Sequence, residues 1–274
     1  MSRYKPLFVV LFLAAAALIA CTKSESASEE ATFELLLTGT PADEATALTV
    51  NFSDIKLVSV NAADDPVITM DGAGGSFDVL QFQNGKTTLL ADATIPDGSY
   101  SQLRLVVKSA TITVENEVRP ITIPSGAQSG LKINIEPPLS ARGGKTSTVT
   151  LDFNAKRVIQ TGNGAYQMSP TALRAVSVSG ALTGSLVNSK GEPLEGGLIG
   201  VEDAQGNPIT ATSSDAKGKF KIITLLEGEY TVTMSLEDYV TQTFKDVAIL
   251  ADGSTRLSED GKIVLLSKDE VIEF

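Results

Sequence analysis

The stretch LTVNFSDIKLVSV at residues 48–60 decides the fold class of this chain. Apolar side chains recur at nearly every second position in it, which is the spacing of a β-strand with one face turned to a core. Residues 102–107, 111–114 and 148–153 show the same alternation, and residues 33–37 form a short apolar run. Beyond the N-terminal region, we find no convincing amphipathic helical pattern. The sequence therefore predicts an all-β protein.

Turn-forming residues separate these strands, as in Asn84-Gly85, Pro96-Asp97-Gly98 and Arg142-Gly143-Gly144. Connections this short favour the strands of a sandwich or barrel over strands linked by crossover helices. A second series of closely spaced strands and turns begins close to Val178. We therefore expect two β-sandwich domains of the immunoglobulin-like or prealbumin-like type, at residues 32–177 and 179–267.

The N-terminus has the pattern of an export signal. Arg3 and Lys5 precede an apolar run at residues 7–18, and the sequence Leu18-Ile19-Ala20-Cys21 follows. The apolar run is shorter than the about 20 residues that a membrane-spanning helix needs. The last four residues resemble the bacterial lipobox, with Leu18, Ile19 and Ala20 before the cysteine. The resemblance implies that residues 1–20 are a lipoprotein signal peptide and that Cys21 is lipidated. An ordinary secretory signal with an incidental cysteine is the alternative.

Residues 21–31 are polar, acidic and without periodicity, which predicts a flexible tether between the lipid and the folded domains. We therefore predict a bacterial cell-envelope protein that is lipid-anchored in the outer membrane. Acidic residues soon after a lipidated cysteine resemble the surface-export signals of Bacteroidetes lipoproteins, which implies exposure on the cell surface. A spacer with no address information is the favoured interpretation of this segment, and the surface-export signal is the alternative.

The composition excludes several classes of function. The net charge is −11, and no basic face is visible that would serve a nucleic-acid binder. The chain has no His, which removes Ser-His-Asp catalysis and the commonest zinc ligand. Cys21 is the single cysteine, so no intramolecular disulfide can form. We therefore predict no catalytic residues, no metal, no cofactor and no enzymatic activity, although carboxylate pairs remain formally possible.

Tyrosines are the candidate ligand contacts, and we name Tyr100, Tyr166 and Tyr239. Tyr100 and Tyr230 each follow a Gly-x pair and open an alternating strand. Each could stack on a sugar, or could pack in the core with its hydroxyl bonded near the turn. The packing interpretation is favoured, and the absence of Trp weakens the proposal of a broad sugar-stacking surface.

Polar residues of the first domain suggest a structural pair and a conceivable metal site. Arg104 lies in mid-strand, where it could pair with Asp152 or Asp78. Asp43, Asp54, Asp78 and Asp152 lie near turns or strand ends, but they lack the close alternate spacing of a calcium loop. We therefore expect the pair and expect no calcium.

Four elements in order make residues 179–267 resemble the carboxypeptidase regulatory-like domain, a transthyretin-like β-sandwich. They are Gly184-Ser185-Leu186, Gly191-Glu192-Pro193-Leu194-Glu195-Gly196, Gly218-Lys219-Phe220 and Leu225-Leu226-Glu227-Gly228-Glu229-Tyr230. Leu186 stands where Val is common in the family. The resemblance implies a non-catalytic module related to carbohydrate-binding folds.

Residues 32–177 resemble the DUF4382 domain, a family of unknown function in bacterial lipoproteins. The resemblance is carried by LTGTPAD at 37–43, FDVLQFQNG at 77–85, IPDGSYSQLRL at 95–105 and LDFNA at 151–155. Gly39-Thr40 stands where the family usually has an acidic residue before Pro-Ala. The resemblance implies a fold and a cellular address, and no activity.

Three functions remain compatible with the sequence. The leading one is a non-enzymatic cell-envelope lipoprotein whose β-domains bind a polysaccharide or another envelope protein. The second is a structural or assembly lipoprotein that supports another envelope protein, and the least favoured is a carboxylate-dependent hydrolase. Carbohydrate is the leading ligand class only through analogy between folds.

Overall fold

The computed structural model describes residues 30–42, 44–60, 67–70, 74–123 and 130–272. The predicted signal peptide, the lipobox with Cys21 and most of the predicted tether lie outside the described residues, as does Asp43. Strands dominate the described residues, and the longest helix is α1 (Lys268–Ile272). Among these residues, none of the helices has the length and apolar character needed to cross a membrane.

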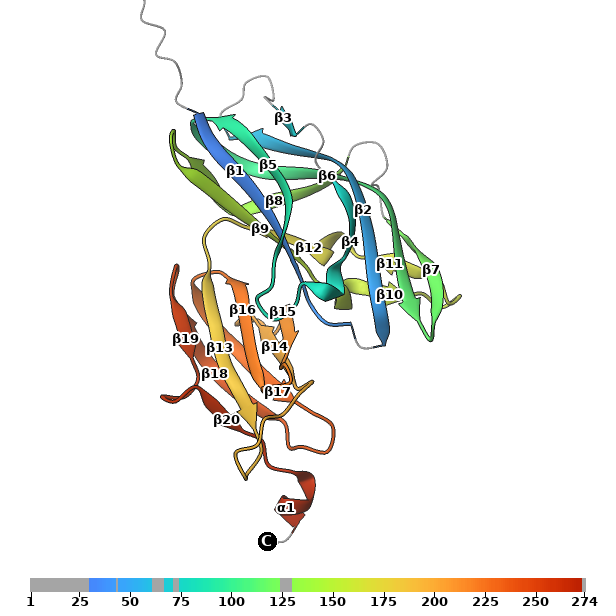
Figure 1. The fold of residues 1–274 in the computed structure, drawn as a ribbon, viewed down its shortest axis with the longest axis vertical. Coiled ribbons are helices and arrows are strands. Elements are labelled where there is room, and N and C mark those ends of the chain that lie inside the picture. Colours follow the sequence, from blue (N-terminus) through green and yellow to red (C-terminus); the bar gives the residue numbers. More distant parts are fainter. Residues whose placement is uncertain (1–29, 43, 61–66, 71–73, 124–129, 273–274) are drawn as a thin grey trace, which may run out of the picture.

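The N-terminal domain contains twelve described strands and three short 3₁₀ helices (Figure 1). The strands are β1 (Glu30–Gly39), β2 (Ala45–Ser59), β3 (Val67–Met70), β4 (Gly75–Asp78), β5 (Thr88–Pro96), β6 (Gly98–Val114), β7 (Glu117–Thr122), β8 (Leu131–Ala141), β9 (Thr146–Phe153), β10 (Val158–Gln160), β11 (Tyr166–Met168) and β12 (Leu173–Val176). The 3₁₀ helices are η1 (Val79–Gln81), η2 (Ala155–Arg157) and η3 (Pro170–Ala172).

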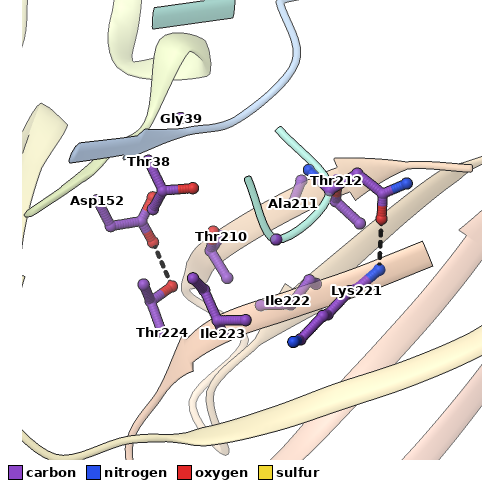
Figure 2. A pocket seen from close by; sticks show the side chains of 12 residues that line it. Thr38, Gly39, Asp152, Thr210, Ala211, Thr212, Lys221, Ile222, Ile223 and Thr224 are labelled. Carbon is purple, nitrogen blue, oxygen red and sulfur yellow. Dashed lines mark hydrogen bonds between the residues drawn. The ribbon is translucent and has the colours of Figure 1, made fainter. Parts of the chain in front are cut away.

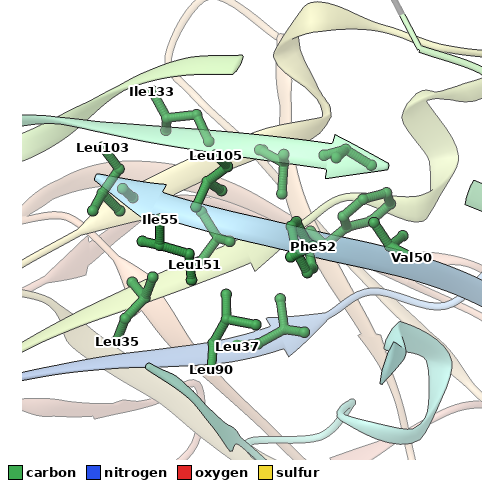
Figure 3. Close-up of a cluster of buried hydrophobic side chains, with 14 of the residues drawn as sticks. Leu35, Leu37, Val50, Phe52, Ile55, Leu90, Leu103, Leu105, Ile133 and Leu151 are labelled. Carbon is green, nitrogen blue, oxygen red and sulfur yellow. The ribbon is translucent and has the colours of Figure 1, made fainter. Parts of the chain in front are cut away.

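The core of this domain lies between two layers of strands, which Figure 3 shows from close by. In one layer β2 pairs antiparallel with β6, and in the other β1 runs parallel to β9 and antiparallel to β5. Side chains such as Ile55 and Leu105 from the first layer meet Leu35 and Leu151 from the second. All four are fully buried. The alternation in residues 48–60 therefore places one face of β2 in the core, as the sequence predicts.

Strand β6 differs from the prediction, because residues 102–107 and 111–114 belong to one strand of 17 residues. Val107 pairs with Phe52 and Ser109 pairs with Asn51, so Lys108 has no partner on β2 and forms a bulge. Lys108 and Ser109 are both exposed, which shifts the phase of the alternation without ending the strand. Glu30 and Ala31, which the prediction placed in the tether, belong to β1, because Ala31 is buried and pairs with Ile95.

The C-terminal domain is a two-sheet sandwich of eight strands (Figure 1). One sheet contains β13 (Gly180–Val187), β16 (Lys219–Leu225), β19 (Ser254–Arg256) and β20 (Lys262–Val264). The other has the order β15 (Pro208–Ser213), β14 (Leu198–Glu202), β17 (Gly228–Ser235) and β18 (Gln242–Ile249). The all-β fold with two sandwich domains is therefore confirmed.

Each domain has a hydrophobic core of its own. The larger cluster runs from Ala31 to Ala175 and the smaller one from Leu182 to Leu265, with no residue in common. The chain passes from one to the other through the short segment between β12 and β13. That the domains fold independently remains a prediction.

Candidate functional site

A turn of the N-terminal domain inserts between the edge strands of the C-terminal sandwich. Asn84 and Gly85 form this turn, with φ angles of 59° and 73°. The Asn84 backbone N–H donates to Thr212 Oγ1 on β15 at 3.0 Å. Its side-chain amide donates to Lys219 O at 3.0 Å and accepts from the Lys221 N–H at 2.6 Å, both on β16. The Asn84 amide thus bonds to the edge of β16 as a neighbouring strand would.

Glycine is required at the second position of this turn. A Cβ on Gly85 would lie 2.8 Å from the Cδ atom of Lys221, and its φ lies in the left-handed region. The turn therefore packs closely on β16 while the Asn84 side chain bonds to it.

A buried group of Asp152, Arg174 and Thr224 also joins the two domains, and Figure 2 shows its hydrogen bond between Asp152 and Thr224. Asp152 on β9 is 3% exposed, and its Oδ2 atom accepts from Arg174 Nη2 at 3.2 Å and from Thr224 Oγ1 at 2.7 Å. Arg174 on β12 lies directly opposite Asp152, and its Nη2 also donates to the Thr224 carbonyl at 2.7 Å. Thr224 belongs to β16, so this group joins the domains. The space left between them here is about 10 Å³, no more than one water needs.

Three hollows surround the 3₁₀ helix η2, which stands between the domains. The largest of the three, the junction groove, has a volume of about 360 Å³. The second, about 280 Å³, lies within the N-terminal domain, and the third, about 190 Å³, lies between the domains. Lys156 lines the first two, and Asn154 and Arg157 line the first and third. One short helix therefore borders all three.

The floor of the junction groove is the outer face of β14, β15 and β17. It presents small, hydroxyl-bearing or aliphatic side chains, and its wall is Asn154, Lys156 and Arg157. The floor residues are Leu198, Gly200, Ala211, Thr233 and Ser235, with Glu202, Pro208 and Thr210 beside them. Asn154 Nδ2 donates to Ile209 O at 3.4 Å and Arg157 Nη2 donates to Pro208 O at 3.3 Å, which fixes wall and floor together.

A larger hollow of about 630 Å³ lies over β13 and β16. Charged side chains of both signs line it, among them Lys219, Asp215 and Arg256. Asn84 also lines it, so both hollows receive residues from both domains, but the junction groove has the more apolar lining. Ligand sites are typically apolar with a few polar groups, so we take the groove as the candidate site.

The candidate tyrosines lie apart from each other. Tyr100 is 3% exposed, and its hydroxyl donates to Pro96 O at 2.8 Å. Tyr166 is buried but lines the 280 Å³ hollow. Tyr239 is half-buried against the C-terminal core, and its backbone forms an isolated β-bridge with Ser267. The structure therefore brings only Tyr166 to the hollows around η2, and its contact with a ligand remains a prediction.

The packing interpretation of Tyr100 and Tyr230 is confirmed. The Tyr230 hydroxyl donates to Leu226 O at 3.0 Å, just before the turn, as that of Tyr100 does to Pro96 O. Burial raises the pKa of both phenols, and for Tyr100 the charge of Asp97 raises the pKa further. These rings are part of the cores and offer no open stacking surface.

The expected partners of Arg104 are bonded elsewhere. Asp152 pairs with Arg174, and Asp78 accepts from the N–H groups of Leu48 and Leu80. Arg104 Nε donates to Gln102 Oε1 at 3.1 Å. The prediction was wrong for Asp152, because the register of β9 with β12 places Arg174 opposite it. Within the described ranges, no cluster of three or more Asp, Glu or Cys side chains could hold a metal ion.

Sequence reasoning missed the residues of the groove wall and floor. Lys156 and Arg157 follow the predicted strand at residues 148–153 and show no motif, and Asn154 lies in LDFNA, which indicated only the family resemblance. Their proximity depends on the docking of two domains. Gly200 was no signal of a close approach either, because a Cβ there would meet no atom nearer than 4.0 Å.

Fold and site define a class: a two-domain all-β protein whose domains dock through polar contacts beside a groove. Residues 30–170, more than half of the chain, match the domain of unknown function DUF4382. The chain therefore belongs to the DUF4382 family. Residues 181–259 match the carboxypeptidase regulatory-like domain, which follows in the expected order.

Known proteins and structures add little to this assignment. No curated protein matches the chain. The Bacillus anthracis TIE protein is 14% identical over 87% of this chain, with a TM-score of 0.26, and the chain spans 34% of that protein. The minor pilin GBS52 of Streptococcus agalactiae is 10% identical over 86% of this chain and 96% of its own, with a TM-score of 0.26. The shaft pilin SpaA of Lactobacillus rhamnosus GG is 12% identical over 88% and 98%, with a TM-score of 0.26. At these TM-scores we draw no functional conclusion from them.

Proposed function

We propose that this protein is a non-enzymatic, lipid-anchored protein of the bacterial cell envelope that binds a polysaccharide in the junction groove. The observation that carries the proposal is the groove itself, whose wall comes from one domain and whose floor comes from the other. The docked domains hold wall and floor in fixed positions, so the site needs no ordering on binding.

The lining of the groove suits a sugar chain. Thr233 and Ser235 offer hydroxyl groups, and Asn154 and Lys156 offer donors from the wall. The aliphatic patch of Leu198 and Ala211 can cover an apolar ring face. Aromatic stacking is absent from this lining, so we expect weak binding per site that repeats along a polymer.

The lipid anchor at Cys21 would hold this site at the membrane. Each buried methylene contributes about 0.8 kcal/mol, so two or more acyl chains give lasting attachment. Replacement of the sulfur in Cys21→Ser should abolish lipidation and membrane retention. Mass spectrometry of the mature N-terminus tests this, and an unacylated peptide from the wild-type protein would contradict the anchor.

Filling the groove tests the binding function. A Cβ on Gly200 would find its nearest neighbour, Thr233 O, at 4.0 Å, so Gly200→Leu adds a side chain to the groove without a clash. We expect the full chain in detergent to be retained on one member of a panel of polysaccharides. We expect Gly200→Leu to bind at least about tenfold more weakly, equal to about 1.4 kcal/mol.

A matched control separates groove filling from the effect of a surface leucine. Gly162 lies in the turn between β10 and β11, and a Cβ there would meet no atom within 4 Å. Gly162→Leu should bind as the wild type does. Equal retention of both variants would place binding elsewhere, and release of product from any polymer would overturn the non-enzymatic assignment.

The domain junction favours a structural function as the second candidate. The contacts of Asn84 and of Asp152 with β16 join the two domains, as a spacer would need. Under this alternative no polysaccharide is retained, and Asn84 variants rather than Gly200 variants impair assembly of a partner in the envelope.

A further inference from the structure

The smallest of the three hollows around η2 is rich in groups that bind anions. Its volume is about 190 Å³, more than ten times the about 10–15 Å³ that one water needs. We call it the arginine pocket, and its polar lining is Arg157, Arg174, Asn154, Asn207, Thr171 and Asp152. It shares Asn154, Arg157 and Pro208 with the junction groove, so the two hollows are adjacent.

The two arginines of the pocket are in different states. Arg174 is ion-paired with Asp152 through Nη2, and it is half-buried. The contact of Arg157 is with the carbonyl of Pro208, and within the described part of the chain no carboxylate pairs with it. The guanidinium of Arg157 therefore keeps most of its donors for a ligand.

A buried donor beside the pocket also lacks an acceptor. The Nε–H of Arg174 is shielded from solvent and has no hydrogen-bond partner in the described residues. A buried unsatisfied donor is costly and commonly marks a place where a water or an anion binds. Both arginines line the arginine pocket, and the Nε–H of Arg174 is enclosed by protein behind this lining.

The charges limit the ligand to one negative group. Arg157 and Arg174 against Asp152 leave the lining with one excess positive charge. Asp203 is hydrogen-bonded to Asn207 at the edge of the pocket, and these bonds lower the pKa of Asp203, so it is ionised at neutral pH. The chain also carries a net charge of −11, which disfavours a polyanion.

We infer that the arginine pocket binds the single carboxylate of an acidic sugar unit, of the uronic acid class, within an otherwise neutral glycan. A guanidinium and a carboxylate are both planar and can form two parallel hydrogen bonds. The carboxylate would lie between Arg157 and Arg174 while the neighbouring sugar units follow the junction groove. This inference rests on the proposed function and specifies its ligand.

Titration with a monosaccharide tests the pocket directly. We expect sodium glucuronate to shift the Nε–H resonances of Arg157 and Arg174 in NMR spectra of the full chain. Glucose with matched sodium chloride should leave them unmoved. Arg157→Gln should weaken glucuronate binding about tenfold or more, the usual effect of losing a charged hydrogen bond. Arg157→Lys should lie between the two.

A matched arginine controls for general charge loss. Arg142 is exposed in the turn between β8 and β9, and Arg142→Gln should bind glucuronate as the wild type does. Equal weakening of Arg142→Gln and Arg157→Gln, or equally tight binding of inorganic sulfate, would overturn the inference. Unshifted arginine resonances in the folded wild type would do so as well.

The outcome separates this inference from the proposed function. In one outcome, a neutral polysaccharide is retained, Gly200→Leu abolishes this retention, and glucuronate has no effect. The proposed binding in the junction groove then stands, and the inference about the arginine pocket is wrong. In the other outcome, glucuronate binding depends on Arg157 but no polysaccharide is retained. The arginine pocket then binds a carboxylate, and the proposed binding of a polysaccharide is wrong.

Discussion

Replacing Asn84 by glycine should loosen the docking of the two domains. Asn84→Gly removes the two side-chain hydrogen bonds to β16, at 3.0 Å to Lys219 O and 2.6 Å from the Lys221 N–H. Glycine accepts the φ of 59° at this position, so the turn itself is kept. The bond from the residue 84 N–H to Thr212 Oγ1 can also remain.

The size of the effect follows from the two lost bonds. Each hydrogen bond contributes about 0.5–1.5 kcal/mol net, and water replaces the partner where the bond is exposed, as both are here. We expect docking to weaken by about 1–2 kcal/mol, a factor of about 5–30 in the equilibrium. The Lys221 amide should therefore exchange its hydrogen about 5–30 times faster.

Hydrogen exchange of the Lys221 amide is the direct assay. Asn116 is the matched control, because it also has a positive φ, 64°, and is exposed in the turn between β6 and β7. Asn116→Gly removes the same side chain and adds the same freedom to the unfolded chain, far from the junction. Unchanged exchange of the Lys221 amide in Asn84→Gly would refute the contribution of Asn84 to docking. Equal changes in Asn84→Gly and Asn116→Gly would refute it as well.

Three further predictions concern stability. Asp152→Ala should lower the unfolding free energy in urea by about 2–4 kcal/mol; the loss stays below the about 3–5 kcal/mol of a fully buried pair because 22% of the Arg174 side chain is exposed. The pKa of Tyr100 is raised in the folded protein, so folding favours the protonated phenol. The contribution of this phenol to the unfolding free energy is therefore complete below its pKa in the unfolded chain, about 10. That contribution is lost as the pH rises through the pKa in the folded protein. Tyr100→Phe should therefore lose less stability than the wild type in urea titrations taken above pH of about 10, and identical pH slopes would contradict this. Residues 179–274 alone should give a β-sheet circular dichroism spectrum, because the C-terminal core takes no residue from the other domain, whereas a disordered spectrum would show a shared core.

Local pattern was enough for much of the fold. The alternation in residues 48–60 predicted β2, and the alternation in residues 148–153 predicted most of β9. The Asn84-Gly85 pair predicted a turn, which the structure confirms. These features depend on the side chains within a short window, because strand period and turn geometry are local properties.

Bulges and registers could not be predicted from local pattern. The bulge at Lys108 joins two predicted strands into β6, and it is defined by the pairing with β2 rather than by the residues of β6 alone. The register of β9 with β12 places Arg174 opposite Asp152, so Arg104 was the wrong partner. Register is set by the strands that surround a residue.

The sequence by itself determined that this chain is an all-β protein of two sandwich domains, because burial of one strand face requires an apolar residue at every second position. Only the tertiary structure decided what the domain junction does. The Asn84 and Lys221 residues that bond there are 137 positions apart, and Thr224 and Asp152 are 72 apart. A polar side chain carries no mark of its distant partner in its own neighbourhood. The partner is set by which surfaces pack, and that packing also brings Arg157 and Gly200 to one groove.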